Sequence, residues 1–557
     1  MKKRLISLLL ILMLLLSLGV SAYAEGSADK RDLIILYTSD VHCGVSKGWG
    51  YAGLAAVKKE LSKGYDVLLV DDGDAIQGEP VGTMTKGDAI IDIMNAVGYD
   101  VVIPGNHEFD YGMDNFLALT KKAKFPYICC NFTREGELVF EPWLIKEIGG
   151  VRIGFVGVDT PFSLIDSAPK NFQDENGNYI YGFMEDETGE RLVEAVQKAV
   201  DEVRAEGVDY VVLLAHLGNE ESCKPWTYSD VISRTTGIDA VLDGHSHDTE
   251  QVVMKDKAGH DVVRSACGTK LEDIGVLHIT RDGKISSELY SWGSSVAAPA
   301  LLGIENNVSK AVSAATKELN KKLSEVVARS SVDLIVNDPG GAKNGATPVR
   351  IVRSAETNLG DLCADAFLDQ SGGADIAIIN GGGIRDWIRQ GDITLNEILT
   401  VFPFGNQLTV IEVTGQTVLD MLEWSVHAAP SEFGGFQQVA GMTFEFDPEI
   451  ESPCVTDDHG GFARVEEGKP RRVGKVLIGG EALDPAKTYS LAGHNFHLLD
   501  CGDGFNMFKG CKVLKTMVAL DNQALISYIT DTLGGVVGDP YTDPYGQGRI
   551  VSTKAAS

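Results

Sequence analysis

The chain has 557 residues and a formal net charge of −30, with 79 acidic against 49 basic side chains. This length exceeds what one hydrophobic core organises, so we expect two to three domains. Apolar residues make up 44% and charged residues 23%, which is typical of globular proteins and excludes wholesale disorder. So acidic a surface repels nucleic-acid polymers and anionic membranes, and any anionic ligand must be drawn in by a local cluster of cations.

Residues 1–24 are typical of a signal peptide. Basic residues at 2–4 precede a nearly unbroken apolar run from Leu5 to Val20, and Ala22-Tyr23-Ala24 supplies a cleavage site before Glu25. A membrane anchor would not need those small residues, and no other apolar run is long enough to span a bilayer. The sequence therefore predicts export, either secretion or retention in the periplasm or cell envelope, and no membrane span in the mature chain.

Short β-branched apolar runs separated by helical patterns predict a layered α/β domain over residues 25–298. The clearest helical stripe joins Leu192, Val196, Val200 and Val203. The expected strands are 33–37, 67–70, 101–103, 151–158, 211–214 and 240–242. Strands that alternate with helices favour a ligand site at the strand ends.

A long amphipathic helix is predicted over residues 308–327, within a linker that we place at 299–329. A turn-rich stretch follows at 337–348. From residue 330 to 557 we expect a second α/β domain, with glycine-rich turns at 381–383 and 502–504. The fold class is thus α/β, a layered β-sandwich flanked by helices and joined by a linker helix to a second α/β domain that binds substrate.

Polar side chains follow five of the strands predicted in the first domain. The loops read Ser39-Asp40-Val41-His42, Asp71-Asp72-Gly73-Asp74, Gly105-Asn106-His107-Glu108-Phe109-Asp110, Leu214-Ala215-His216 and Asp243-Gly244-His245-Ser246-His247. A lone histidine after a strand is more often a hydrogen-bonded polar residue than a metal ligand. Five such loops, which we expect at one edge of one sheet, indicate a metal site instead.

The mixture of imidazole and carboxylate ligands suits a divalent metal such as Zn, Mn or Fe, whereas Ca would prefer oxygen ligands alone. The loops offer enough ligands for two ions that share one carboxylate. Two ions about 3.5–4 Å apart can hold a hydroxide and clamp a phosphoryl oxygen for in-line attack. The ligand set therefore predicts a dinuclear site for phosphoryl transfer to water.

In this order the motifs resemble those of the calcineurin-like metallophosphoesterase superfamily. The extended motif Gly-Asn-His-Glu-Phe-Asp, together with the second domain, is similar to the secreted 5′-nucleotidase family, whose members include UDP-sugar hydrolases and ecto-5′-nucleotidases. The resemblance covers nearly the whole mature chain. It implies a metallophosphoesterase catalytic domain at residues 25–298 and a 5′-nucleotidase C-terminal domain at 330–557.

The resemblance also implies the metal ligands and a catalytic pair. Two divalent ions, Zn, Mn or similar, would be bound by Asp40, His42 and His247 on one side, by Asn106, His216 and His245 on the other, and by Asp74 as the bridge. His107 and Asp110 lie three residues apart in a loop that enters a helix, so the carboxylate can orient the imidazole and stabilise its charged form. In the family this pair faces the transferring phosphoryl group, where it stabilises the transition state or protonates the leaving alkoxide.

The second domain carries arginines beside glycine-rich segments. Arg350 and Arg353 precede Glu356-Thr357-Asn358-Leu359-Gly360, and Arg385 closes the segment Asn380-Gly381-Gly382-Gly383-Ile384-Arg385. A guanidinium group matches phosphate oxygens in geometry, although from the residues alone a surface ion pair is an equally good interpretation of each arginine. The resemblance implies that Arg353, Arg385 and Arg350 contact the terminal phosphate and that Asn380 lies near the base.

Further contacts to the nucleoside are implied by the same resemblance. Asp503 would accept hydrogen bonds from the ribose hydroxyls, and two phenylalanines would sandwich the base. Phe404 fits the first aromatic position. The second aligns with His497, whereas Phe496 lies one residue earlier; we favour Phe496 and keep His497 as the alternative.

The expected function is an exported dinuclear-metal 5′-nucleotidase that hydrolyses nucleoside 5′-phosphates to nucleoside and phosphate. Two alternatives on the same scaffold remain open, a 2′,3′-cyclic-nucleotide 2′-phosphodiesterase with 3′-nucleotidase activity and a UDP-sugar hydrolase. From a different class, the chain could bind nucleotides or metal without catalysis. The expected partner is a nucleotide substrate rather than a nucleic-acid polymer.

Overall fold

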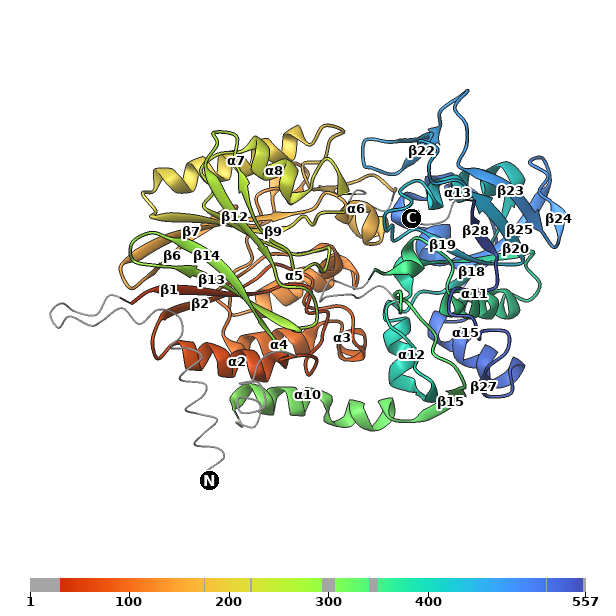
Figure 1. The fold of residues 1–557 in the computed structure, drawn as a ribbon, viewed down its shortest axis with the longest axis horizontal. Helices are drawn as coiled ribbons and strands as arrows, with labels where there is room; N and C mark the ends of the chain where they lie inside the picture. The colour runs from red at the N-terminus through yellow and green to blue at the C-terminus, as the bar shows by residue number, and fades with distance from the viewer. Residues whose placement is uncertain are drawn as a thin grey trace.

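The computed structural model describes residues 31–174, 176–220, 223–292, 306–339, 349–516 and 518–553. It contains two α/β domains side by side, connected by one helix that runs along the first domain (Figure 1). The predicted signal peptide, the first part of the predicted linker and most of the turn-rich stretch lie outside the described residues.

The first domain is built on two sheets packed face to face. Their strand orders are β14-β13-β1-β2-β3 and β11-β12-β10-β9-β7-β6. The strands are β1 (Leu33–Thr38), β2 (Asp66–Asp71), β3 (Val101–Val102), β6 (Trp143–Ile148), β7 (Val151–Asp159), β9 (Tyr210–His216), β10 (Ala240–Asp243), β11 (Gln251–Lys255), β12 (Asp261–Ala266), β13 (Asp273–Ile279) and β14 (Ile285–Ser291). Ile35 and Val70 of one sheet meet Phe155 and Leu214 of the other in a buried core, so both sheets are shielded on their inner faces.

Helices cover the outer faces of the two sheets, as the predicted layering requires. Over the first sheet and around its ligand-bearing loops lie α2 (Gly50–Leu61), α3 (Pro80–Thr85), α4 (Asp88–Val97) and α5 (Met113–Lys122); over the second lie α7 (Glu190–Ala205) and α8 (Tyr228–Arg234). Helix α7 buries Leu192, Val196, Val200 and Val203, so the predicted apolar stripe is confirmed. Short elements complete the domain: β4 (Thr133–Arg134), β5 (Glu137–Leu138), α6 (Ser163–Asp166) and β8 (Tyr181–Gly182).

All six predicted strands are present, but the expectation that the ligand-bearing strands share one sheet is wrong. β1, β2 and β3 pair in parallel within the first sheet, whereas β9 and β10 pair in parallel within the second. Strand pairing depends on contacts between residues that are distant along the chain. Strands that are buried on both faces have similar apolar sequences whichever sheet they belong to. The two sets of strand ends nevertheless reach the same edge of the sandwich.

The linker helix, α10, is shorter than predicted. It spans Asn307–Leu323 and packs Val308, Val312 and Leu319 against the helices of the first domain. The chain then leaves the helix at Ser324 and enters β15 (Val326–Ser330), where Val326 pairs with Thr394. The predicted end at residue 327 is wrong because β-branched residues there satisfy their backbone groups in a strand rather than a helix.

The second domain is also α/β, with a central sheet of order β19-β16-β25-β18-β26 and three smaller sheets, β17-β15-β27, β24-β23-β20-β28 and β21-β22. Its remaining strands are β16 (Ile376–Asn380), β17 (Gly391–Thr394), β18 (Leu408–Thr414), β19 (Gln437–Ala440), β20 (Met442–Phe446), β21 (Cys454–Thr456), β22 (Phe462–Val465), β23 (Val473–Ile478), β24 (Glu481–Ala482), β25 (Thr488–His494), β26 (Lys512–Lys515), β27 (Val536–Val537) and β28 (Ile550–Ser552). Its helices are α11 (Asn358–Gln370), α12 (Leu395–Val401), α13 (Gly415–Ser425), α14 (Asn495–Leu498) and α15 (Asp521–Ser527).

The predicted glycine-rich turns follow β16 and α14, as the short 3-10 segments Gly381–Gly383 and Gly502–Gly504. The second of these turns contacts α6 of the first domain. The turns thus lie at the boundary of the two domains. Of the helices that the structure describes, none combines the length and the apolar character needed to cross a bilayer.

Candidate active site

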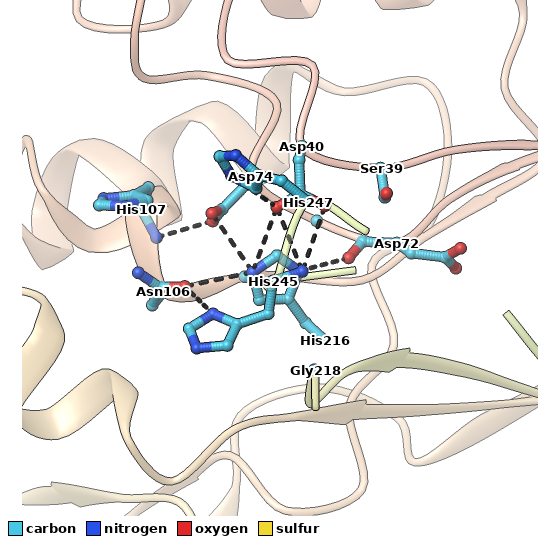
Figure 2. A network of polar contacts seen from close by, with 12 residues as sticks. Ser39, Asp40, Asp72, Asp74, Asn106, His107, His216, Gly218, His245 and His247 are labelled. Atoms are coloured by element: carbon cyan, nitrogen blue, oxygen red, sulfur yellow. Dashed lines mark hydrogen bonds and ion pairs between the residues drawn. The ribbon is translucent and has the colours of Figure 1, made fainter. Parts of the chain in front are cut away.

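The five polar loops of the first domain converge at the ends of strands from both sheets (Figure 2). The expected metal ligands all belong to this convergence: Asp40 and His42 after β1, Asp74 after β2, Asn106 after β3, His216 at the end of β9, and His245 and His247 after β10. The structure therefore brings together every residue that the sequence assigned to the metal site.

Five of these seven residues have a left-handed backbone, which side chains other than glycine adopt at an energetic cost. Their φ angles are 50° at Asp40, 45° at His42, 59° at Asp74, 79° at His245 and 56° at His247. Such concentrated strain indicates loops that are bent to direct side chains inward. Close packing leaves no room beside them, since a Cβ atom at Gly105 would lie 2.5 Å from Asp74 Oδ1.

The donor atoms form two clusters that share a carboxylate. In one, His42 Nε2 lies 3.0 Å from His247 Nε2, and Asp40 Oδ1 lies 3.5 Å from that same His247 nitrogen. In the other, Asn106 Oδ1 lies 3.1 Å from His216 Nε2 and 2.9 Å from His245 Nδ1.

Asp74 lies between the two clusters. Its Oδ2 atom is 3.2 Å from His216 Nε2 and 3.7 Å from His42 Nε2, one histidine of each cluster. Asp40 approaches both clusters as well, because Oδ1 is 4.0 Å from His216 Nε2.

Outer hydrogen bonds orient the imidazoles so that their lone pairs point into the clusters. His42 Nδ1 and His216 Nδ1 donate to the backbone carbonyls of Gln77, at 3.0 Å, and Asp72, at 2.7 Å, which leaves Nε2 as the inward atom of each ring. Burial lowers the pKa of His42 and of His247 well below the usual range, so these rings are neutral. Two neutral nitrogens 3.0 Å apart, with carboxylates beside them, form a donor set that fits a divalent cation.

His216 behaves differently from the other histidines of the site. Burial lowers its pKa, but the negative charges of Asp74 and Asp40 outweigh burial and raise the pKa well above the usual range. This shift reports the excess negative charge of the site. Two groups of three side chains have ligand atoms within 4.8 Å of one another, Asp40 with His42 and His247, and Asp40 with Asp74 and His216.

Two buried side chains outside the predicted set hold the loops in place. The Glu108 carboxylate accepts N–H groups from Asp74, at 2.8 Å, and from Gly105, at 2.7 Å, and so ties the second loop to the third. Arg264 pairs with Asp243 and with Asp248 at 2.7 Å each, one on either side of the His245–His247 segment. No sequence pattern predicts the role of Glu108 or of Arg264, because each contacts segments that are distant from it along the chain.

The predicted catalytic pair is formed at the edge of the metal cluster. His107 Nδ1 lies 2.6 Å from Asp110 Oδ2. The His107 backbone N–H donates to Asp74 Oδ1 at 2.8 Å, as Figure 2 shows. Burial lowers the pKa of His107, but the charges of Asp110 and Asp74 outweigh burial and raise it to about 9. Ser167, which the sequence did not single out, donates its hydroxyl to Asp110 Oδ1 at 2.9 Å and fixes the carboxylate that orients His107.

Arg353 and Arg385 of the second domain line the same pocket as residues of the metal cluster. Among the residues described by the structure, no carboxylate lies within ion-pair distance of either guanidinium group. Burial and the positive charges of Arg353 and Arg350 lower the pKa of Arg385 to about 9. Two half-buried guanidinium groups that repel each other and have no carboxylate partner among the described residues make a subsite for an anion.

Arg350 is placed differently from the other two arginines. Its guanidinium group pairs with Glu220 of the first domain at 2.7 Å and with Glu432 of the second domain at 2.6 Å. These two carboxylates neutralise the positive charge of the Arg350 guanidinium group. In this structure Arg350 is therefore a bridge between the domains, beside the anion subsite.

A cavity of about 300 Å³ adjoins the anion subsite. Its lining includes Phe404, Phe496, Asn380 and Asp503 from the second domain, together with the catalytic pair of the first. The Phe404 ring lies 5.6 Å from the His107 ring, and the Arg385 guanidinium group lies 5.7 Å from the centre of the Phe404 ring. All substrate residues named from the sequence, except Arg350, line this cavity.

Asp166 is a lining residue that the sequence did not predict. Its Oδ2 atom accepts the Asn106 side-chain N–H at 2.8 Å, which turns Asn106 Oδ1 towards His216 and His245. Burial, followed by the charge of Asp503, raises the pKa of Asp166 to about 7. No motif surrounds Asp166, and its contact with Asn106 joins segments that are 60 residues apart along the chain.

A second cavity of about 610 Å³ also borders the cluster. Its lining includes His42 and His247 of the metal site and Arg353 and Arg385 of the second domain. Lys270, Trp387 and Arg389 also line this cavity. The arginines of the anion subsite therefore line both cavities.

The chain matches two family models in succession, calcineurin-like phosphoesterase at residues 33–249 and the 5′-nucleotidase C-terminal domain at residues 327–510. The "Trifunctional nucleotide phosphoesterase protein YfkN" of Bacillus subtilis (strain 168) is 26% identical over 527 residues, which are 86% of this chain and 32% of that protein. The chain thus spans about a third of the length of that relative. "Protein UshA" of Escherichia coli (strain K12) is 26% identical over 553 residues, 91% of this chain and 92% of UshA.

A crystal structure of a 5′-nucleotidase precursor from Thermus thermophilus superimposes with a TM-score of 0.75 at 26% identity, covering 94% of this chain and 100% of that one. The two family matches occupy the two domains, and the candidate site lies where these domains meet. With both of its domains matched, the chain combines a calcineurin-like phosphoesterase domain with a 5′-nucleotidase C-terminal domain.

Proposed function

We propose that the protein is an exported 5′-nucleotidase that uses two divalent metal ions to hydrolyse nucleoside 5′-monophosphates to nucleoside and phosphate. One observation supports this most strongly: the unpaired guanidinium groups of Arg353 and Arg385 lie between a cluster of metal donors and a cavity with aromatic residues in its lining. A phosphate between them would meet the arginines on one side and the metal donors on the other. Export rests on the N-terminal sequence alone.

The chain's own residues have separable roles in this proposal. Asp40, His42 and His247 would hold one ion, Asn106, His216 and His245 the other, and Asp74 would bridge them. The ions would activate water and neutralise charge on the phosphoryl oxygens. Arg353 and Arg385 bind the remaining phosphoryl oxygens.

The pair of His107 and Asp110 serves the leaving group. Asp110 occupies His107 Nδ1, so Nε2 is the ring atom that can donate to a phosphoryl oxygen or give a proton to the departing 5′ oxygen. The nucleoside then rests in the 300 Å³ cavity, where Phe404 and Phe496 offer aromatic surface and Asp503 offers a hydrogen-bond acceptor. This division of labour supports a catalytic domain at residues 25–298, a linker at 299–329 and a substrate domain at 330–557.

Phosphate release by the mature chain tests the proposal. The protein is stripped of metal, reloaded with Zn or Mn, and given AMP, UMP, 2′,3′-cyclic AMP, UDP-glucose and glycerol phosphate. We expect metal-dependent release from the two monophosphates and little from glycerol phosphate, which lacks a nucleoside. Equal release from glycerol phosphate, or no release with either metal, would contradict the proposal.

The second cavity favours one further substrate, a UDP-sugar. A phosphate that carries a second substituent besides the nucleoside could place that substituent in this 610 Å³ cavity, which a nucleoside monophosphate would not fill. UDP-glucose would then give UMP and glucose phosphate. Retention of AMP hydrolysis with no turnover of UDP-glucose would remove this second candidate.

A further inference from the structure

His497 is buried directly beneath the nucleoside cavity. Its side chain is 1% exposed, and its Nε2 atom lies 2.7 Å from Asp503 Oδ2. The ring packs edge-on between Phe496 and Phe505, each with its ring centre 4.8 Å away. A ring enclosed in this way offers no face to a base, so His497 acts on the cavity only through Asp503.

Among the residues that the structure describes, Asp503 has hydrogen-bond partners at one of its two carboxylate oxygens. Oδ2 accepts from His497 and, at 3.0 Å, from the Asn380 side-chain N–H. Asn380 is in turn fixed by His494, whose Nδ1 lies 3.3 Å from Asn380 Oδ1. Two donors on one oxygen determine the rotation of the carboxylate about its χ angles.

The other oxygen, Oδ1, is directed towards the cavity. A Cβ atom at Gly434, a residue of the cavity wall, would lie 3.5 Å from Asp503 Oδ1. Gly434 has no side chain, so a ligand hydroxyl can take this place. The Asp503 backbone is strained, with φ at 51°, and the Trp424 indole N–H donates to its carbonyl at 2.8 Å.

We propose that His497 is a specificity-determining positioning residue, which holds the Asp503 carboxylate through Oδ2 so that Oδ1 accepts a hydrogen bond from a ribose hydroxyl. This inference rests on the proposed nucleotidase function for its substrate. It assigns recognition of the sugar, rather than stacking on the base, to His497. The consequence is discrimination between ribonucleosides and nucleosides that lack the 2′ and 3′ hydroxyls.

Calorimetric binding of adenosine and of 2′,3′-dideoxyadenosine tests this proposal without requiring catalysis. The ratio of the two affinities is measured for the parent protein, His497→Phe, His497→Gln and Asp503→Asn. Phe fills the space without a donor, so His497→Phe should lower the ratio about tenfold, the value of one hydrogen bond to a charged group. Gln places an amide N–H near the Nε2 position and should restore part of the ratio.

A double variant and a matched control separate positioning from a general structural effect. In the Asp503→Asn background, His497→Phe should change the ratio no further, because both act through one carboxylate. His427→Phe makes the same substitution at a half-buried histidine stacked on Trp424 and should keep the parental ratio. Equal losses of both affinities in His497→Phe, or a further fall of the ratio in the double variant, would overturn the proposal.

A separate measurement tests the proposed nucleotidase function independently of the role of His497. Phosphate release from AMP is measured on the same parent sample. Discrimination between the two nucleosides without phosphate release would keep the role of His497 and refute the nucleotidase assignment. Phosphate release from AMP without any discrimination in the parent protein would keep the nucleotidase assignment and refute the role of His497.

Discussion

Replacing Arg385 with methionine should weaken catalysis and, at the same time, stabilise the metal-free fold. Arg385 and Arg353 are half-buried guanidinium groups without carboxylate partners in the part of the chain that the structure describes. Such a pair is favourable only when an anion lies between the two groups. Methionine keeps much of the side-chain length and removes the charge.

The catalytic loss follows from the bonds that Arg385 can make. A hydrogen bond from a charged donor to phosphate contributes about 1.5–3 kcal/mol in a buried site. The loss of one such interaction in the transition state corresponds to a fall in kcat/KM of about 10- to 150-fold.

The gain in stability follows from the pKa of the same group. Burial and the charge of Arg353 lower the Arg385 pKa from its usual value to about 9. A base with a lower pKa in the folded state destabilises the fold at every pH below that lower value, and the cost fades as the pH rises towards the unfolded value. At neutral pH the cost is fully present, so the melting temperature of metal-free Arg385→Met should rise by about 2–4 °C.

Steady-state phosphate release from AMP and calorimetric melting of the metal-free protein measure the two effects. Arg350→Met is the matched control, because it removes a guanidinium group that pairs with Glu220 and Glu432. It should lower the melting temperature and cost less in kcat/KM than Arg385→Met. An Arg385→Met protein with parental kcat/KM, or a larger catalytic loss in Arg350→Met, would refute the assignment of the anion subsite.

Three further substitutions test other parts of the site. Asp74→Asn should bind fewer than two metal ions per chain by elemental analysis, because the bridging charge is lost; two fully bound ions would remove Asp74 from the bridge. His107→Ala should keep its metal and lose turnover by about 10²–10⁴-fold, and unchanged turnover would exclude it from the mechanism. Glu108→Gln should lower the free energy of unfolding by about 2–4 kcal/mol, because an amide cannot accept all the N–H groups that the carboxylate accepts. Denaturant unfolding of Glu108→Gln at parental stability would contradict that role.

The metal site could be predicted from the sequence because every ligand lies at the end of a strand or a few residues after it. Strand ends are local features, and the run from Asp40 to His247 in the sequence already contains every donor that the structure gathers. The pairing of the strands could not be predicted in the same way. β1 and β9 belong to different sheets, and only the contact between those sheets brings Asp40 near His216.

The residues that the sequence missed act across long distances or between domains. Ser167 reaches Asp110, and Asp166 reaches Asn106, from a segment without any motif. The choice between Phe496 and His497 also required the three-dimensional structure, because neighbouring positions in a short helix differ mainly in the direction in which their side chains point. The structure places Phe496 in the cavity lining and turns His497 towards Asp503.

The rate of phosphate release from AMP, plotted against the number of Zn ions bound per chain, tests the central claim most directly. Metal-free protein is titrated with Zn, and bound metal and rate are measured on the same samples. We expect the rate to stay low until the second ion binds and to reach its plateau at two ions per chain. A plateau at one ion, or a rate independent of bound metal, would contradict a two-metal phosphoesterase.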